Sequence, residues 1–131
     1  MTRPLTSILL AVAGFVLFYI GTSVMLTPQA FYASNAIVLT GDASQLSEIR
    51  APAGLLLVSG VLLGFGALRR ELTRTSLVVA AVVYGTYGLS RVASILLDGW
   101  PSSGLVSAMA IELVVGGLAA VAWLVSRPER S

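Results

Sequence analysis

The stretch from Leu77 to Leu97 reads LVVAAVVYGTYGLSRVASILL and decides how this chain folds. An α-helix needs about 20 mostly apolar residues to cross the hydrocarbon core of a bilayer, and this run is that long. It carries one charge, Arg91, and is followed directly by Asp98. The stretch therefore predicts a membrane-spanning helix with a cation inside it.

The polar side chains of this predicted helix share one face. At about 100 degrees per residue they fall within roughly 80 degrees of arc. They are Tyr84, Tyr87, Arg91, Ser94 and Asp98. A guanidinium at membrane depth costs at least ~2.5 kcal/mol on insertion scales, so Arg91 is expected to face protein or water rather than lipid. Another part of the chain must then supply its partner.

Composition supports the same class of protein. The chain has 131 residues, of which 56% are hydrophobic and 11% charged. A soluble domain of this size leaves a large share of its surface exposed and could not bury so much apolar area. We therefore expect one integral membrane domain, an all-α bundle of four transmembrane helices over residues 1–131, embedded in the lipid bilayer.

Absent residue types exclude several kinds of chemistry. The sequence has no Cys and no His, and all eight of its basic residues are Arg. Disulfides, thiolate or imidazole metal ligands, imidazole-bound haem and lysine Schiff bases are therefore excluded. Asp, Glu and Tyr remain for proton transfer, and carboxylates alone could hold a hard cation. We expect no cofactor and no metal site.

The predicted spans cover residues 6–27, 46–68, 76–97 and 103–125. A signal peptide is the alternative for the first span, which follows Arg3. Its apolar run of about 19 residues exceeds the usual 7 to 15, and no A-x-A cleavage site follows. We therefore expect a retained helix.

The connection over residues 28–47 is the longest polar one. A short interfacial segment is predicted at residues 31–40. Asp42 followed by Gln45 resembles a helix start with a capping side chain and a reciprocal partner.

The second span contains a proline near its start. A helix that begins at Asp42 places Pro52 in its interior and leaves the carbonyl of Glu48 without a donor. A start at Ser47 would place the proline near the first turn, where it is unstrained. We favour the first alternative. Gly60 and Gly64 form a G-x-x-x-G pair that permits close helix contact.

Basic residues outside the spans set the expected orientation. They flank the first and fourth spans and join the second to the third, as Arg3, Arg69, Arg70, Arg74, Arg127 and Arg130. The other two connections hold Asp42 and Asp98, with Arg50 at the edge of a span. The positive-inside rule then places both termini in the cytoplasm, and we expect a multi-pass protein of the cell inner (plasma) membrane. Topology explains the net charge of +2, so nucleic acid is not expected as a partner.

Charged residues from neighbouring helices are predicted to meet in the outer half of this bundle. At 1.5 Å per residue, Arg91 and Glu112 lie about 9 and 10 Å from the outer ends of their helices, which a short turn joins. We expect them to form a buried ion pair. The full set of candidate ligand-binding residues is Arg91, Glu112, Glu48, Arg50, Asp98, Tyr84 and Tyr87. Interface anchoring or packing is the alternative role for Arg50, Asp98 and the tyrosines.

These features together resemble a known family. They are Pro28, Glu48-Ile49-Arg50 before a glycine-rich span, Arg91 followed by Asp98-Gly99-Trp100-Pro101, and Glu112 in the fourth span. The pattern is similar to the small four-helix bacterial membrane proteins catalogued as domain of unknown function four-three-four-five. The resemblance implies the fold and the site positions but no reaction.

Three functions are compatible with this sequence. In the first, Arg91, flanked by Glu112 and Glu48, binds or passes a small anionic or amphipathic, lipid-like molecule that enters from the outer leaflet. The second is a membrane enzyme, with isomerase-like or hydrolase-like acid/base chemistry on a lipid or isoprenoid-like substrate. Its candidate acid or base is Glu48, helped by Tyr84 or Tyr87. The third is a structural subunit or homo-oligomer whose charges only fix the helices together.

Overall fold

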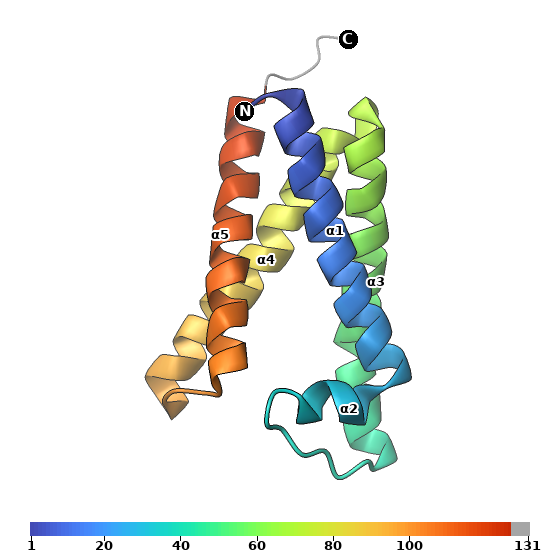
Figure 1. Ribbon diagram of the computed structural model, residues 1–131, viewed down its shortest axis with the longest axis vertical. Helices are drawn as coiled ribbons and strands as arrows, with labels where there is room; N and C mark the ends of the chain where they lie inside the picture. Colours follow the sequence, from blue (N-terminus) through green and yellow to red (C-terminus); the bar gives the residue numbers. More distant parts are fainter. Residues whose placement is uncertain (127–131) are drawn as a thin grey trace.

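A computed structural model describes residues 1–126 of the chain and shows an all-α fold (Figure 1). Its helices are α1 (Arg3–Leu26), α2 (Pro28–Ala33), α3 (Ala43–Leu68), α4 (Arg70–Asp98) and α5 (Ser103–Val125). Arg127 and Arg130, which contribute to the predicted topology, lie outside the described residues.

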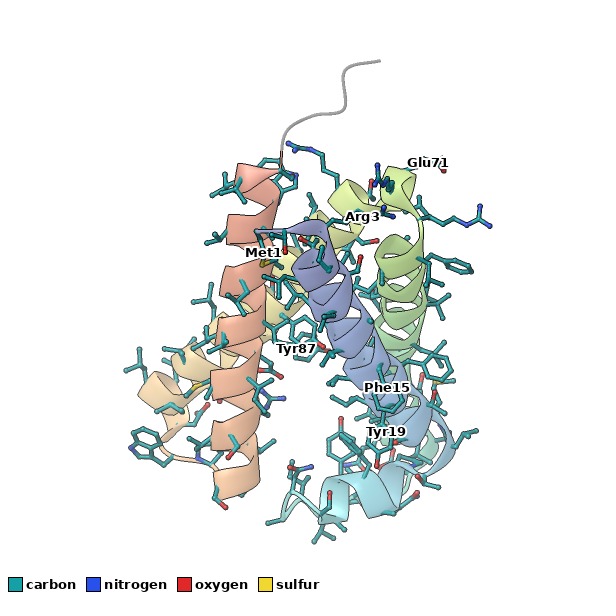
Figure 2. The ribbon with its side chains drawn as sticks, turned by 45° about the horizontal axis from the view of Figure 1, so that its top comes forward. Met1, Arg3, Phe15, Tyr19, Glu71 and Tyr87 are labelled. Atoms are coloured by element: carbon teal, nitrogen blue, oxygen red, sulfur yellow. The ribbon has the colours of Figure 1, made fainter. Side chains whose placement is uncertain are left out.

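The four long helices are suited to a bilayer. By length and composition α1, α3, α4 and α5 could each cross a membrane. Their outward faces carry large apolar side chains, such as Leu97, which is 82% exposed. On α1, Phe15 and Tyr19 stack on the outside of the bundle with ring centroids 6.5 Å apart (Figure 2). Exposed apolar surface of this extent is typical of a multi-pass membrane protein.

The long helices form two hairpins, in which α1 packs against α3 and α4 packs against α5. Backbone contact at glycines holds each pair together. A Cβ atom on Gly60 would lie 2.7 Å from the carbonyl oxygen of Gly14, and one on Gly116 would lie 2.7 Å from the amide nitrogen of Gly85. Only residues without a side chain allow this approach. The predicted close contact at Gly60 is therefore confirmed, whereas a Cβ on Gly64 would meet open space.

The two hairpins diverge along the bundle (Figure 1). They meet at the closed end, which we define as the end that holds the N-terminus and the junction of α3 with α4. There, the hydroxyl groups of Ser76 and Thr73 donate to the carbonyl oxygens of Leu62 and Gly66 at 3.0 and 2.8 Å. At the other end, the splayed end, lie α2 and the turn between α4 and α5.

Helix α2 occupies the splayed end, but with other bounds than the predicted segment at 31–40. It begins at Pro28, where the missing amide donor costs nothing, and it ends at Ala33. The chain leaves the helix through Ala36, whose φ of 60° is left-handed. The hydroxyl of Ser102 then donates to the carbonyl oxygen of Asn35 at 3.1 Å, which connects this segment to the start of α5.

The start of α3 agrees with the favoured alternative. Asp42 accepts a hydrogen bond from the amide of Gln45 at 3.0 Å, and the side chain of Gln45 accepts one from the amide of Gly41 at 3.2 Å. The helix therefore begins directly after Asp42, and Pro52 lies inside it.

Helix α4 begins earlier than the predicted span. Arg69 alone, in an extended conformation, separates it from α3, so Arg74 is helical rather than part of a loop. Hydropathy marks only the apolar part of a helix. The six residues from Arg70 to Thr75 include good helix formers, and they extend α4 by more than one turn.

Candidate functional site

A cavity of about 530 Å³ lies between the two hairpins near the splayed end. Side chains from all five helices line it, and most of them are apolar. The apolar set includes Val16, Leu17, Ile20, Val24, Leu56, Val83, Leu105 and Ile111. Ligand sites in proteins commonly combine such apolar walls with a few polar groups in fixed positions.

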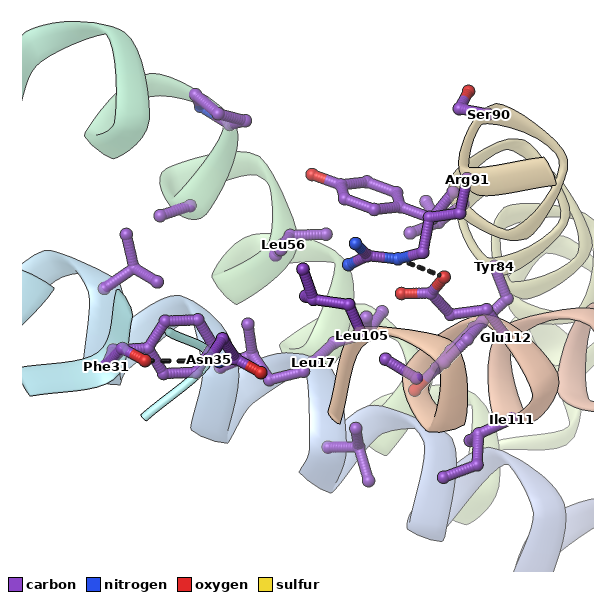
Figure 3. Close-up of a pocket in the computed structure, with 18 of the residues that line it drawn as sticks. Leu17, Phe31, Asn35, Leu56, Tyr84, Ser90, Arg91, Leu105, Ile111 and Glu112 are labelled. Carbon is purple, nitrogen blue, oxygen red and sulfur yellow. Dashed lines mark hydrogen bonds and ion pairs between the residues drawn. The ribbon is translucent and has the colours of Figure 1, made fainter. Parts of the chain in front are cut away.

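Arg91 and Glu112 provide the charged part of this cavity (Figure 3). The Nε atom of Arg91 donates to Oε2 of Glu112 at 2.8 Å, so the predicted pairing of α4 with α5 is confirmed. The pair is less buried than predicted, because the side chains of Arg91 and Glu112 are 31% and 13% exposed. The divergence of the hairpins leaves the guanidinium accessible from the cavity.

The ion pair uses only part of the arginine. Within residues 1–126, the two terminal Nη nitrogens of Arg91 donate to no protein acceptor. Figure 3 shows this edge of the guanidinium pointing into the cavity, away from Glu112. A planar pair of such donors matches the two oxygens of a carboxylate or phosphate group. The cavity therefore presents unused charged donors beside an apolar space.

The two tyrosines of the polar stripe differ in their environment. Tyr84 is 3% exposed, and its hydroxyl donates to the carbonyl oxygen of Ala13 at 2.6 Å. It therefore links α4 to α1 at the cavity wall. Tyr87 also lines the cavity, between the hairpins (Figure 2). Its hydroxyl has no hydrogen-bond partner in the described part of the chain.

The other three candidate residues lie outside the cavity lining. Glu48 is exposed, so the acid/base hypothesis has no support from its position. Arg50 donates from Nε to the carbonyl oxygen of Met25 at 3.2 Å, at the C-terminal end of α1, where a cation is favoured. Asp98 is the exposed last residue of α4. The structure thus brings together four of the seven predicted residues.

Several cavity residues were absent from the predicted set. Ser90, next to Arg91, lines the cavity although it lies outside the polar stripe. Asn35 does so because the loop after α2 turns back toward α5, which no local pattern indicates. Phe31 and Tyr32, which lie in the predicted interfacial segment at 31–40, form part of the cavity wall. The aromatic character of these two residues was the sequence feature that could have indicated a place in the cavity wall.

The residues that the structure describes contain no group of three or more His, Cys, Asp or Glu side chains close enough to hold a metal ion. The described lining of the cavity offers the ion pair, hydroxyl groups and apolar walls.

Comparison with known families agrees with this architecture. Residues 5–124 match the family described as Domain of unknown function (DUF4345). The chain belongs to this family. No curated protein and no solved structure matches it. The description of the DUF4345 family names no activity, so the function has to be argued from the cavity itself.

Proposed function

We propose that this DUF4345 protein is a multi-pass membrane protein whose cavity binds an amphipathic small molecule. The anionic head of the ligand contacts Arg91, and its apolar tail fills the space between the hairpins. One observation carries the proposal: a partly exposed guanidinium, fixed through Nε, directs its remaining donors into an apolar cavity.

The head group is expected to carry at least two oxygen acceptors. Glu112 occupies the Nε side of Arg91 and leaves the Nη edge, which fits a carboxylate or phosphate oxygen pair. The negative charge of Glu112 offsets the positive charge of Arg91, so the pair exerts little long-range attraction on anions. Direct hydrogen bonds, rather than long-range charge, would then distinguish the head group.

The tail is expected to be a hydrocarbon. The leucine, isoleucine and valine side chains of the cavity wall offer no polar partner to it, and each buried CH₂ group contributes ~0.8 kcal/mol. The volume of about 530 Å³ lies within the usual range for small-molecule sites.

We infer further that the closed end faces the cytoplasm of a bacterial inner membrane. The positive-inside rule supports this orientation, because Arg3, Arg69 and Arg70 come from two segments that meet at that end (Figure 1). The cavity then lies in the outer half of the bilayer. In intact cells, a membrane-impermeant maleimide should label Ser34→Cys and not Glu71→Cys; the chain has no other cysteine. The reverse pattern would exclude this orientation.

A pair of probes that differ only in the head tests the binding proposal. The purified protein in detergent is titrated with oleate and with oleyl alcohol. Hydrogen bonds to charged groups contribute ~1.5–3 kcal/mol, so oleate should bind about 10-fold to 100-fold more tightly. Arg91→Gln should remove this preference.

Arg50→Gln is the matched control, because Arg50 lies toward the same end of the bundle but outside the cavity lining. It should retain the preference for oleate. If folded Arg91→Gln protein still prefers oleate as strongly as the unmodified chain, Arg91 does not bind the head group and the proposal fails.

A further inference from the structure

A second cavity, of about 470 Å³, lies at the closed end of the bundle. It is bounded by the first turns of α1 and α4 and by the end of α5. Three arginines line it, Arg3, Arg70 and Arg74, together with one carboxylate, Glu71. Arg3 and Glu71 both lie at this end in Figure 2. This cavity shares no lining residue with the cavity that holds Arg91.

Within residues 1–126, no carboxylate forms an ion pair with the arginines of the second cavity. Across residues 1–126 the pair of Arg91 with Glu112 is the one ion pair within 4.0 Å. The guanidinium groups of Arg3, Arg70 and Arg74 therefore have no carboxylate partner in the described chain. Glu71 lines the same cavity without pairing with any of them.

Arg74 is held in place at this cavity. Its Nη1 donates to the carbonyl oxygen of Ser126 at 2.6 Å and to the hydroxyl of the same residue at 3.0 Å. The guanidinium also lies 4.8 Å from the ring centre of Trp123. These contacts position the cation before any ligand binds, which lowers the entropy cost of binding.

The polarity of the lining is mixed. The hydroxyl-bearing residues Thr6, Thr73 and Ser126 lie beside the apolar residues Leu77 and Ala122. Basic pockets between membrane helices on the cytoplasmic side bind phosphate-bearing lipid head groups.

We propose that the closed-end cavity binds a phosphate group, carried either by an anionic lipid or by a soluble phosphate compound. Arginine forks match phosphate oxygens in geometry and charge, and three arginines against one carboxylate give the excess positive charge that this requires. The site is independent of the proposed amphipathic ligand near Arg91.

Native mass spectrometry of the full chain in detergent tests this proposal. Phosphatidylglycerol and phosphatidylcholine are the lipid probes, and inorganic phosphate is the soluble probe. Each arginine near a lipid surface contributes enough attraction for a roughly fivefold change in affinity, so Arg3→Gln and Arg70→Gln should each weaken phosphatidylglycerol binding by about that factor. Arg74→Gln is less informative, because it also removes the contacts to α5.

Arg69→Gln is the matched control. Arg69 is adjacent to Arg70 and is also an arginine, but it does not line the cavity. Its substitution should change binding less than twofold. Each variant is also compared in an Arg91→Gln background, which removes the contribution of the other cavity.

Selective binding of phosphatidylglycerol identifies a lipid as the source of the phosphate. Binding of inorganic phosphate with the same dependence on Arg3 and Arg70 identifies a soluble source. Equal losses in Arg69→Gln and Arg70→Gln would show general charge attraction and overturn the proposal, as would the absence of binding to every probe.

Discussion

Adding one methyl group at Gly60 or at Gly64 should have opposite effects on stability, although both glycines lie on the same helix. At Gly60 the new Cβ would lie 2.6 Å from the amide nitrogen of Phe18 and 2.7 Å from the carbonyl oxygen of Gly14. Both atoms belong to the backbone, so α1 and α3 must separate by about 0.8 Å to restore ordinary contact. At Gly64 the new Cβ would meet no atom within 4 Å.

The magnitudes follow from these contacts. Alanine is favoured over glycine inside a helix by ~1 kcal/mol, and this gain is common to both variants. Overpacking costs ~1–3 kcal/mol, and the upper part of that range applies to Gly60 because a backbone cannot rotate away. Gly60→Ala should therefore lose ~1–2 kcal/mol of unfolding free energy, whereas Gly64→Ala should gain up to ~1 kcal/mol.

Unfolding by sodium dodecyl sulfate in mixed micelles, followed by far-ultraviolet circular dichroism, measures both variants against the unmodified protein. Their difference isolates the contact between α1 and α3, because the helix preference cancels. Equal stability of the two variants, or a greater loss in Gly64→Ala, would refute the proposed crossing of these helices at Gly60.

Three further predictions use the same unfolding assay. Tyr84→Phe removes the hydrogen bond to Ala13 and should cost ~0.6–1.5 kcal/mol; an unchanged stability would mean that this bond adds nothing. Gly99→Ala should lose ~1–3 kcal/mol, because a φ of 93° with a ψ of −174° is almost restricted to glycine; a tolerated alanine would contradict this turn geometry. A hydrogen bond from the Thr40 hydroxyl is the main cause of the lowered pKa of Asp42, and hydrogen bonds from backbone amides lower this pKa further. The ionised form of Asp42 therefore stabilises the fold above the pKa of the unfolded state, and this stabilisation is lost as the pH falls through the lower folded pKa. Asp42→Asn should remove that pH dependence, and an unchanged acid profile would show that Asp42 does not contribute.

The sequence was sufficient to predict the four long helices, though not all their bounds, and the central ion pair, for physical reasons that can be named. Long apolar runs have few alternatives to a spanning helix, because lipid offers no partner for backbone polar groups. The pairing of Arg91 with Glu112 followed from the cost of an unpaired charge and from the short turn between α4 and α5, which fixes both residues at a similar depth.

The shape of the site could not be derived in the same way. Hydropathy reports that a helix is apolar, but not the angle at which it leaves its neighbour, so the divergence of the hairpins was not predicted. The contact of Arg50 with Met25 depends on where α1 ends beside α3, and that of Ser102 with Asn35 depends on the path of the loop after α2. Such contacts join segments whose relative positions are set only by the whole fold.

The closed-end junction of α3 and α4 has a mechanical consequence. Close glycine contacts lie inside each hairpin, and the two hairpins are joined at the closed end where Ser76 meets Leu62. Two further hydrogen bonds join them nearer the cavity, from Tyr84 to Ala13 and from Ser102 to Asn35. Arg91 lies 15 residues farther along α4 than Ser76, a lever arm of about 22 Å. A tilt of about 5 degrees between the hairpins would move Arg91 by about 2 Å, roughly the size of a methyl group, without breaking any contact inside either hairpin. The width available to a guest molecule thus depends on the angle between the hairpins, which the hydrogen bonds of Tyr84 and Ser102 restrict.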